Sequence, residues 1–303
     1  MNDTTATSQE SSDYRTGIIY ALIGTMLFSI KPVLVKLAYA AGGDATTIMS
    51  LRAASSLPLY VAILLWLCKD IGHRNKLQQY GWQAALVGIL GYYFASLLDI
   101  LALEYISAQL ERLLIFLFPS FVVFISWIVM KETPRKGTFA SISLGYAGVA
   151  MIVLHDFSSF GYQVWLGSIM AIGSALVFAV YLVLSKKVIG NIGPQLFTSV
   201  GMGSAGIVIM AQYQIKGVQF TDMSTELIWM GIAIGLFCTV LPSYFVAAAM
   251  ARLTPSVLSL TSNIGPAVTA LFAITLLGEA FTIWHGLGMA LVVYSVVNIN
   301  KKA

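Results

Sequence analysis

The sequence predicts an all-α membrane protein with ten transmembrane helices, arranged as two inverted repeats of five helices. Hydrophobic residues make up 58% of the 303 residues and charged residues only 10%, whereas about 25% of a soluble domain is charged. A helix needs roughly 20 apolar residues to cross a bilayer. Apolar stretches of about this length follow one another along the chain. Its two halves also share one pattern of proline, glutamate and apolar residues.

The expected spans divide into two sets of five, joined by the segment 155–161. Residues 17–155 form the first repeat and residues 162–300 the second, whereas the Ser- and Thr-rich residues 1–16 are expected to be a disordered cytoplasmic tail. Most connections are short, so consecutive helices should be antiparallel neighbours. The spans cover residues 17–39, 45–67, 81–103, 107–130, 137–154, 162–185, 195–213, 227–249, 254–277 and 281–299.

Two matched regions reveal the repeat. Pro119 and Glu132 recur as Pro266 and Glu279, each 147 residues later. A shift of 150 places residues 17–38 on 167–188 and aligns seven identical residues. Because five is an odd number, the second copy must cross the membrane in the opposite direction to the first. Inverted repeats of this kind are typical of secondary transporters, which bind substrate near the midplane between the halves.

The basic residues predict the orientation, because cytoplasmic loops of membrane proteins are rich in Lys and Arg. With the N-terminus in the cytoplasm, the outer loops hold only Lys216. We therefore expect a multi-pass protein of the cell (inner) membrane with both termini cytoplasmic. Twelve of the 17 basic residues then lie on the cytoplasmic side: Arg15, Lys69, Arg74, Lys76, Lys131, Arg135, Lys136, Lys186, Lys187, Arg252, Lys301 and Lys302.

Charged residues within the first five spans predict a binding site. A charge at membrane depth is costly and usually faces a cavity or a partner. With a rise of 1.5 Å per residue, Lys31 and Arg52 both lie about 15 Å below the first outer turn. We predict that they line one cavity and contact the negative end of a substrate. The six ionisable residues in these spans are Lys31, Lys36, Arg52, Asp99, Glu111 and Arg112.

The other charged residues leave alternatives open. Asp99 and Arg112 lie roughly 10 Å deep on consecutive helices, with Glu111 at a similar depth, so they either bind substrate or form a structural ion pair. We predict an Asp99–Arg112 pair. Lys36 is shallower and can extend to the surface. For Glu279, stabilisation at a helix N-terminus is favoured over proton coupling.

Polar residues elsewhere extend the candidate site. Tyr181 aligns with Lys31 in the repeat, and Tyr92 shares a helical face with Asp99 through i, i+7 spacing. Tyr244 and Asn263 lie beside prolines within later spans. These side chains could contact an amphipathic substrate, and the alternative for each tyrosine is helix packing.

The sequence contains no motif of a hydrolase or a nucleotide-binding loop. His73, His155 and His285 are scattered along it, and the two cysteines have no metal or redox spacing. We therefore expect no catalytic residue, metal or cofactor and no nucleic-acid partner. The expected partners are a small-molecule substrate, the lipid bilayer and a proton as candidate coupling ion, for a chain that is a monomer or weak dimer.

The matched segments 102–132 and 249–279 resemble the EamA repeat of the drug/metabolite transporter superfamily. The resemblance extends over residues 17–300 and implies ten helices around a central cavity formed mainly by helices one, three, four, six, eight and nine. Members of this family export amino acids, other metabolites or drugs, and related branches exchange sugar phosphates or nucleotide sugars. The run Leu110–Leu113, with its two charges, differs from the plain apolar fourth helix of many relatives.

We therefore expect a secondary transporter that exports a small polar metabolite with a carboxylate, either amino-acid-like or another organic anion, by alternating access. The four basic residues within the spans outnumber the two acidic ones, which favours an anionic group. The alternatives are a multidrug or cation exporter, which should use a carboxylate without neighbouring cations, and a lipid-handling membrane protein of the same superfamily.

Overall fold

The computed structural model describes residues 3–130, 137–217, 223–254, 257–258 and 261–301, and every regular element within these ranges is a helix. Its α-helices are α1 (Asp3–Ala40), α2 (Ala45–Leu67), α3 (Ile71–Ile89), α4 (Ser96–Tyr105), α5 (Ala108–Ile115), α6 (Phe118–Met130), α7 (Thr138–Phe160), α8 (Gln163–Ile192), α9 (Pro194–Lys216), α10 (Thr225–Gly235), α11 (Leu241–Arg252), α13 (Gly265–Leu277) and α14 (Ile283–Lys301). Two π-helical segments, η1 (Leu90–Ala95) and η3 (Leu236–Val240), and one 3₁₀ turn, η4 (Ser262–Ile264), join some of them.

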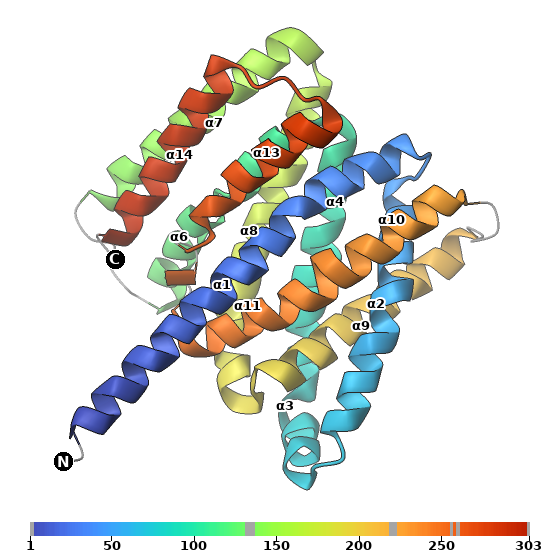
Figure 1. The fold of residues 1–303 in the computed structure, drawn as a ribbon, viewed down its shortest axis with the longest axis vertical. Helices are drawn as coiled ribbons and strands as arrows, with labels where there is room; N and C mark the ends of the chain where they lie inside the picture. The colour runs from blue at the N-terminus through green and yellow to red at the C-terminus, as the bar shows by residue number, and fades with distance from the viewer. Residues whose placement is uncertain (1–2, 131–136, 218–222, 255–256, 259–260, 302–303) are drawn as a thin grey trace.

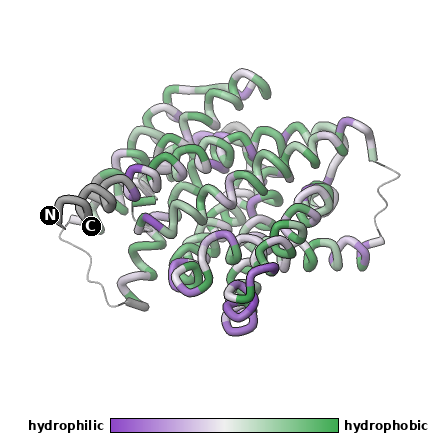
Figure 2. The backbone as a smooth tube through the Cα atoms, turned by 60° about the horizontal axis from the view of Figure 1, so that its bottom comes forward, coloured by the Kyte–Doolittle hydropathy of each residue, from purple (hydrophilic) through white to green (hydrophobic). Residues whose placement is uncertain are grey.

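These elements form the ten predicted spans. Seven helical stretches of the described chain are long and apolar enough to cross a membrane, and shorter apolar helices overlap the other three predicted spans at residues 142–156, 265–277 and 283–295. Hydrophobic residues follow most of the tube in Figure 2, and hydrophilic stretches gather at helix ends. The predicted all-α membrane fold is therefore confirmed.

The packing of the helices follows the inverted repeat. The first helix of one half, α1, packs against α11 and α13, the third and fourth helices of the other half. Reciprocally, α8 packs against α4 and α6. The two second helices, α2 and α9, pair with each other, and the two fifth helices, α7 and α14, lie side by side at one edge of the molecule (Figure 1). Equivalent helices thus make equivalent contacts, as an inverted repeat requires.

Short polar caps and glycines begin and end the helices. The side chains of Asp44, Ser107 and Ser224 accept hydrogen bonds from backbone N–H groups in the first turns of α2, α5 and α10, which satisfies donors that a helix leaves unpaired. Gly193, with φ 83°, joins α8 directly to α9. These signals explain why the connections between consecutive spans are so short.

The first helix begins earlier than the sequence predicted. Residues 3–16, expected to form a disordered tail, continue α1 as helix back to Asp3. The physical reason is that extending an existing helix adds one hydrogen bond for each residue fixed, whereas starting a separate helix is costly. The apolar part of this helix follows Arg15 and Thr16.

The third and fourth helices of both repeats are interrupted at matching places. The third helix contains η1 in the first half and η3 in the second, and π-helical turns of this kind often mark functional sites. The fourth helix breaks before Phe118–Pro119 in the first half and at η4, before Gly265–Pro266, in the second. A proline cannot donate the backbone hydrogen bond of a helix interior, so the repeated proline positions predict these breaks.

Glycines allow two pairs of helices to approach closely. A Cβ atom added at Gly88 of α3 would collide with the backbone of Gly201 in α9. Gly231 and Gly235 of α10 have GxxxG spacing; Gly231 packs on Leu51, and Gly235 lies against Ser55 of α2. Small residues are known to permit such contacts between membrane helices.

Substitution of Gly88 by alanine is therefore expected to destabilise the protein by about 1–3 kcal/mol, because the added methyl group overpacks a backbone-to-backbone contact. The measurement is the thermal unfolding midpoint in detergent. Gly203→Ala is the matched control in α9, since a Cβ there meets no atom within 4 Å. Equal midpoints for the two variants would contradict the contact.

Candidate substrate-binding site

A central cavity lies where the interrupted helices meet α1, α2 and α8. The volume open to the centres of water molecules is about 110 Å³. Its wall combines charged, hydroxyl and aromatic side chains from both repeats. Of the nine predicted site residues, Lys31, Arg52, Tyr92, Asp99 and Arg112 line it. The expectation that Lys31 and Arg52 line one cavity is therefore met.

Lys31 of α1 forms an ion pair with Asp99 of α4. The side chains are only 14% and 4% exposed, so a buried carboxylate is neutralised by a buried ammonium group. The predicted Asp99–Arg112 pair is wrong: the carboxylate of Asp99 bonds to Lys31, although Arg112 lines the same cavity. Depth along the chain favoured Arg112, at roughly 10 Å like Asp99, over Lys31 at about 15 Å, but the rotation of each helix about its axis also decides which cation the carboxylate meets.

Arg112 of α5 keeps donors available. One Nη2 hydrogen bond reaches Ser29 Oγ of α1 at 3.1 Å, while Nε is buried and has no hydrogen-bond partner among the described residues. Gly265 provides room for the guanidinium, because a Cβ there would lie 3.1 Å from Nη2. An arginine fork with unsatisfied N–H groups beside a cavity is suited to bind a carboxylate.

Arg52 lies on α2 and is 4% exposed. Its guanidinium donates to Ser96 Oγ at 2.5 Å and to the backbone oxygen of Tyr92 at 3.2 Å. Both partners are neutral and belong to the η1–α4 region. The guanidinium is thus held in place while its positive charge remains uncompensated by these bonds.

Glu111 lies one residue before Arg112 and is 0% exposed. Neither carboxylate oxygen has a hydrogen-bond partner of acceptable geometry within the described chain. The charges of Asp99, Lys31 and Arg112 are close enough to interact with it. An unpartnered carboxyl group in the protein interior is costly in its charged form, so Glu111 is suited to hold a proton.

Aromatic rings form the apolar part of the cavity wall, which includes Phe28, Tyr92, Phe116, Phe118 and Phe178. They come from α1, η1, the break in the fourth helix, and α8. The ring of Phe118 stands edge-on to Phe178, with centroids 5.4 Å apart. The cavity therefore combines charged groups with aromatic surface.

The remaining predicted residues are dispersed. Tyr181 packs edge-on against Tyr92 at 5.4 Å, behind the cavity wall. The hydroxyl of Tyr244 bonds to Ser199 Oγ at 2.7 Å, between α11 and α9, so its observed contact is helix packing. Asn263 belongs to η4, whose Ser262 lines the cavity, and its side chain lies outside the described residues.

Glu279 has a structural role on a different helix from the one expected. Its carboxylate accepts hydrogen bonds from the backbone N–H groups of Ala108 at 2.7 Å and Gln109 at 3.2 Å. It therefore caps α5 across the repeat interface rather than the α14 helix that follows it. Lys36 is half-buried and close enough to Glu279 to interact with its charge. Glu132, its equivalent, lies outside the described residues.

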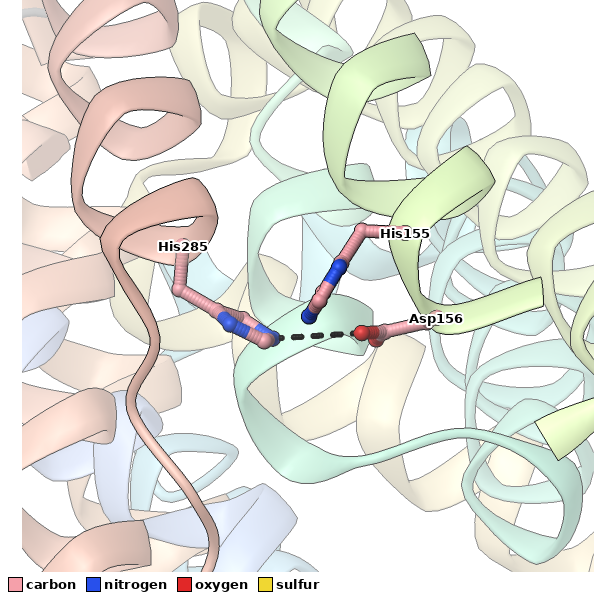
Figure 3. Close-up of side chains that lie close together, drawn as sticks. All are labelled: His155, Asp156 and His285. Atoms are coloured by element: carbon pink, nitrogen blue, oxygen red, sulfur yellow. Dashed lines mark ion pairs between the residues drawn. The ribbon is translucent and has the colours of Figure 1, made fainter. Parts of the chain in front are cut away.

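Two histidines that are distant in the sequence come together at the edge of the molecule. His155 and Asp156 at the end of α7 face His285 at the start of α14 (Figure 3). The expectation of scattered histidines is correct for the half-buried His73 but wrong for this pair. The sequence separation of 130 residues between His155 and His285 concealed the contact that the pairing of the two fifth helices creates.

Hydroxyl groups in the cavity wall and behind it were not predicted from the sequence. Ser96 bonds to Arg52, Ser29 bonds to Arg112, and Thr25 bonds to Ser262 at 3.0 Å. Serine and threonine are common in membrane spans and carry no charge that would mark them. Their only signal was helical spacing: Ser96 precedes Asp99 by three residues, and Thr25 and Ser29 precede Lys31 along α1.

Comparison with known sequences identifies the family. Residues 15–154 and residues 165–301 each match the EamA-like transporter family. The chain belongs to this family. The two matches coincide with the two predicted repeats, so the resemblance that the sequence suggested is confirmed, and the protein is a membrane transporter.

Individual relatives share low sequence identity with this EamA-like transporter. An "Uncharacterized transporter YcbK" of Bacillus subtilis (strain 168) is 26% identical, and the alignment covers 97% of each chain. An "Uncharacterized transporter" of Clostridium kluyveri is 24% identical over 72% of this chain and 73% of its own. A solved crystal structure superposes with a TM-score of 0.68 over 93% of this chain and 96% of its own, at 17% identity, which supports the fold alone.

Proposed function

We propose that this EamA-like transporter exports a small organic anion that carries a carboxylate and an apolar or aromatic portion, by alternating access. The observation that carries the proposal is Arg112, whose buried Nε lacks a partner while the guanidinium lines the cavity. A substrate carboxylate in the cavity would satisfy this donor through a paired hydrogen bond.

The charge balance of the cavity supports an anionic substrate. Three cationic side chains and one carboxylate line it. Because Lys31 and Asp99 neutralise each other, Arg52 and Arg112 leave an excess of positive charge. A cation exporter would need the opposite balance, since bringing a second cation beside two buried guanidinium groups is unfavourable.

The aromatic rings of the cavity wall support a substrate with an apolar portion. Phe28, Phe118 and Phe178 line the same cavity as the polar groups. Pockets of this composition bind a ligand through apolar contact and use a few polar groups to fix its orientation. An amino acid with an apolar side chain, or another amphipathic carboxylate, has the required chemistry.

Alternating access is supported by the matched interruptions in the third and fourth helices. Broken helices at a repeat interface surround the substrate in many secondary transporters, and one repeat then moves against the other. Export and the orientation with both termini in the cytoplasm of a bacterial inner membrane are parts of the proposal. The distribution of Lys and Arg supports the orientation, and the resemblance to exporters supports the direction.

A ligand panel tests the proposed substrate class. Full-length protein in detergent is heated with matched pairs of compounds that differ only in a carboxylate or a carboxamide. Carboxylates with an apolar group are expected to raise the unfolding midpoint, because a ligand that binds the folded state stabilises it, whereas their carboxamides are not. Stabilisation by lipophilic cations alone would favour a multidrug exporter, and stabilisation by phospholipid alone would favour a lipid-handling protein.

We also propose that a proton is the coupling ion and that Glu111 carries it. The carboxyl group is fully buried, has no hydrogen bond of standard geometry within the described part of the chain, and lies close enough to the carboxyl group of Asp99 to interact with it. Two neighbouring carboxyl groups in a buried site cannot both ionise easily. Movement of substrate into contact with Arg112 would then change the charge environment of Glu111.

The variant Glu111→Gln is expected to lose the dependence of transport on a pH gradient while it still exchanges substrate across the membrane. Glutamine keeps the size and polarity of the side chain but cannot release a proton. Transport in proteoliposomes with and without an imposed gradient measures the effect. Glu104→Gln, at an exposed position of α4, is the matched control and should respond like the unmodified protein. A Glu111→Gln variant that still responds to the gradient would exclude this carrier.

A further inference from the structure

We propose that His155, Asp156 and His285 form a site for a divalent transition-metal ion of the zinc type, which joins the two repeats at the α7–α14 pair. Their candidate ligand atoms all lie within 4.8 Å of one another. Figure 3 shows the imidazole of His285, on α14, directed toward Asp156 and His155 on α7. The site is separate from the central cavity, whose lining includes none of the three residues.

The spacing of the ligand atoms fits a tetrahedral ion. His285 Nε2 and Asp156 Oδ1 are 3.5 Å apart. Zinc lies about 2.0–2.2 Å from nitrogen and oxygen ligands, so two ligands of a tetrahedral site are about 3.4 Å apart. These two atoms already have that separation, and a small movement of the His155 ring would complete the set.

The surroundings hold His285 in a suitable orientation. Its Nδ1 lies 2.7 Å from the hydroxyl of Thr282. Metal-bound histidines commonly donate a hydrogen bond through the second ring N–H. An ion on Nε2 therefore requires Nδ1 to donate to the Thr282 hydroxyl, and the longer contact of 3.4 Å from the Thr282 backbone N–H to Nδ1 would then be lost. Thr282 Oγ1 also lies 3.5 Å from His155 Nε2, so the hydroxyl touches both imidazoles.

Burial and donor type identify the class of ion. Asp156 and His285 have side chains only 5% and 7% exposed, so a divalent cation would compensate a buried carboxylate. Two imidazole nitrogens with one carboxylate oxygen suit zinc and other first-row transition metals, whereas magnesium and calcium prefer sets of oxygen ligands. Three protein ligands leave a fourth position for water.

Because the three residues come from both repeats, a bound ion would connect the repeats. His155 and Asp156 belong to the last helix of the first repeat, and His285 to the last helix of the second. An ion bound by all three residues links α7 to α14 at the end where the chain passes from one repeat to the other. It would therefore stabilise the contact between the fifth helices.

The test is zinc binding by full-length protein in detergent after removal of metal with a chelator. Calorimetric titration with Zn²⁺ is expected to give one site per chain, and a Co²⁺-loaded sample should show the visible absorption of tetrahedral coordination. Asp156→Asn and His285→Gln should weaken binding at least tenfold. Thr282→Val, which removes only the supporting hydroxyl, should weaken it about 10- to 100-fold.

His73→Gln is the matched control, because His73 lies 3.8 Å from Asp70 on an exposed turn without a third such ligand nearby among the described residues. This variant should bind zinc like the unmodified protein. If a buried substitution prevents folding, His155→Gln, at the more exposed ligand, provides the same comparison. Absence of zinc binding by the unmodified protein, or equal binding by the His285→Gln and His73→Gln variants, would overturn the site.

Discussion

Replacement of Arg112 by glutamine is expected to abolish specific transport while the protein still folds and reaches the membrane. The substitution removes the positive charge and the unpartnered Nε donor from the cavity, and the loss of one partner of a buried charged pair costs about 2–5 kcal/mol of binding free energy. Substrate uptake by proteoliposomes at low substrate concentration measures the effect. Among the described residues, the hydrogen bond to a protein side chain that the substitution removes in the empty state is the one to Ser29.

Two further variants separate charge from geometry. Arg112→Lys keeps the charge but loses the planar fork, so we expect weakened rather than absent transport. Arg74→Gln, at an exposed arginine that bonds to the backbone oxygen of Cys68, should transport normally. Normal transport by Arg112→Gln would remove Arg112 from the site.

Replacement of Asp99 by asparagine is expected to destabilise the folded protein by about 3–5 kcal/mol, because it leaves the Lys31 ammonium group without its counter-ion in a buried place. The double variant Lys31→Met/Asp99→Asn should recover much of that loss, since no isolated charge remains. Thermal or denaturant unfolding in detergent measures all three proteins. The recovery distinguishes an ion pair from two independent polar residues.

The exposed pair between Asp13 and Arg252 provides a comparison. Its atoms are 3.9 Å apart, and its side chains are 68% and 33% exposed. Surface ion pairs contribute about 0–1 kcal/mol, so Asp13→Asn should have little effect. A Lys31/Asp99 double variant that is no more stable than Asp99→Asn would show that the pair does not act as a unit.

The fold was predictable because its signals are periodic and long. Apolar spans, repeated prolines and the odd number of helices per half are properties of the sequence itself. The repeated Pro119 and Pro266 also marked the places where the fourth helices break. The extension of α1 to Asp3 was not predictable from composition, because helix propagation depends on the helix that follows.

The candidate site was predictable in its charges but not in its pairings. Lys31, Arg52, Asp99 and Arg112 line one cavity, as the cost of burying charge in a membrane implies. Their partners depend on helix rotation, which neither depth nor hydropathy reveals, so Asp99 was paired with the wrong cation. The same limit applies to His155 and His285, which meet only because the fifth helices of the two repeats pack together.

Substrate exchange in proteoliposomes tests the proposed transport function most directly. Vesicles that contain the purified protein are loaded with an unlabelled amphipathic carboxylate and diluted into a trace of the labelled compound. We expect saturable accumulation of the label, no accumulation of the matched carboxamide, and none in vesicles that contain the Arg112→Gln variant. Equal accumulation of carboxylate and carboxamide, or undiminished exchange by Arg112→Gln, would contradict a carboxylate site at the central cavity.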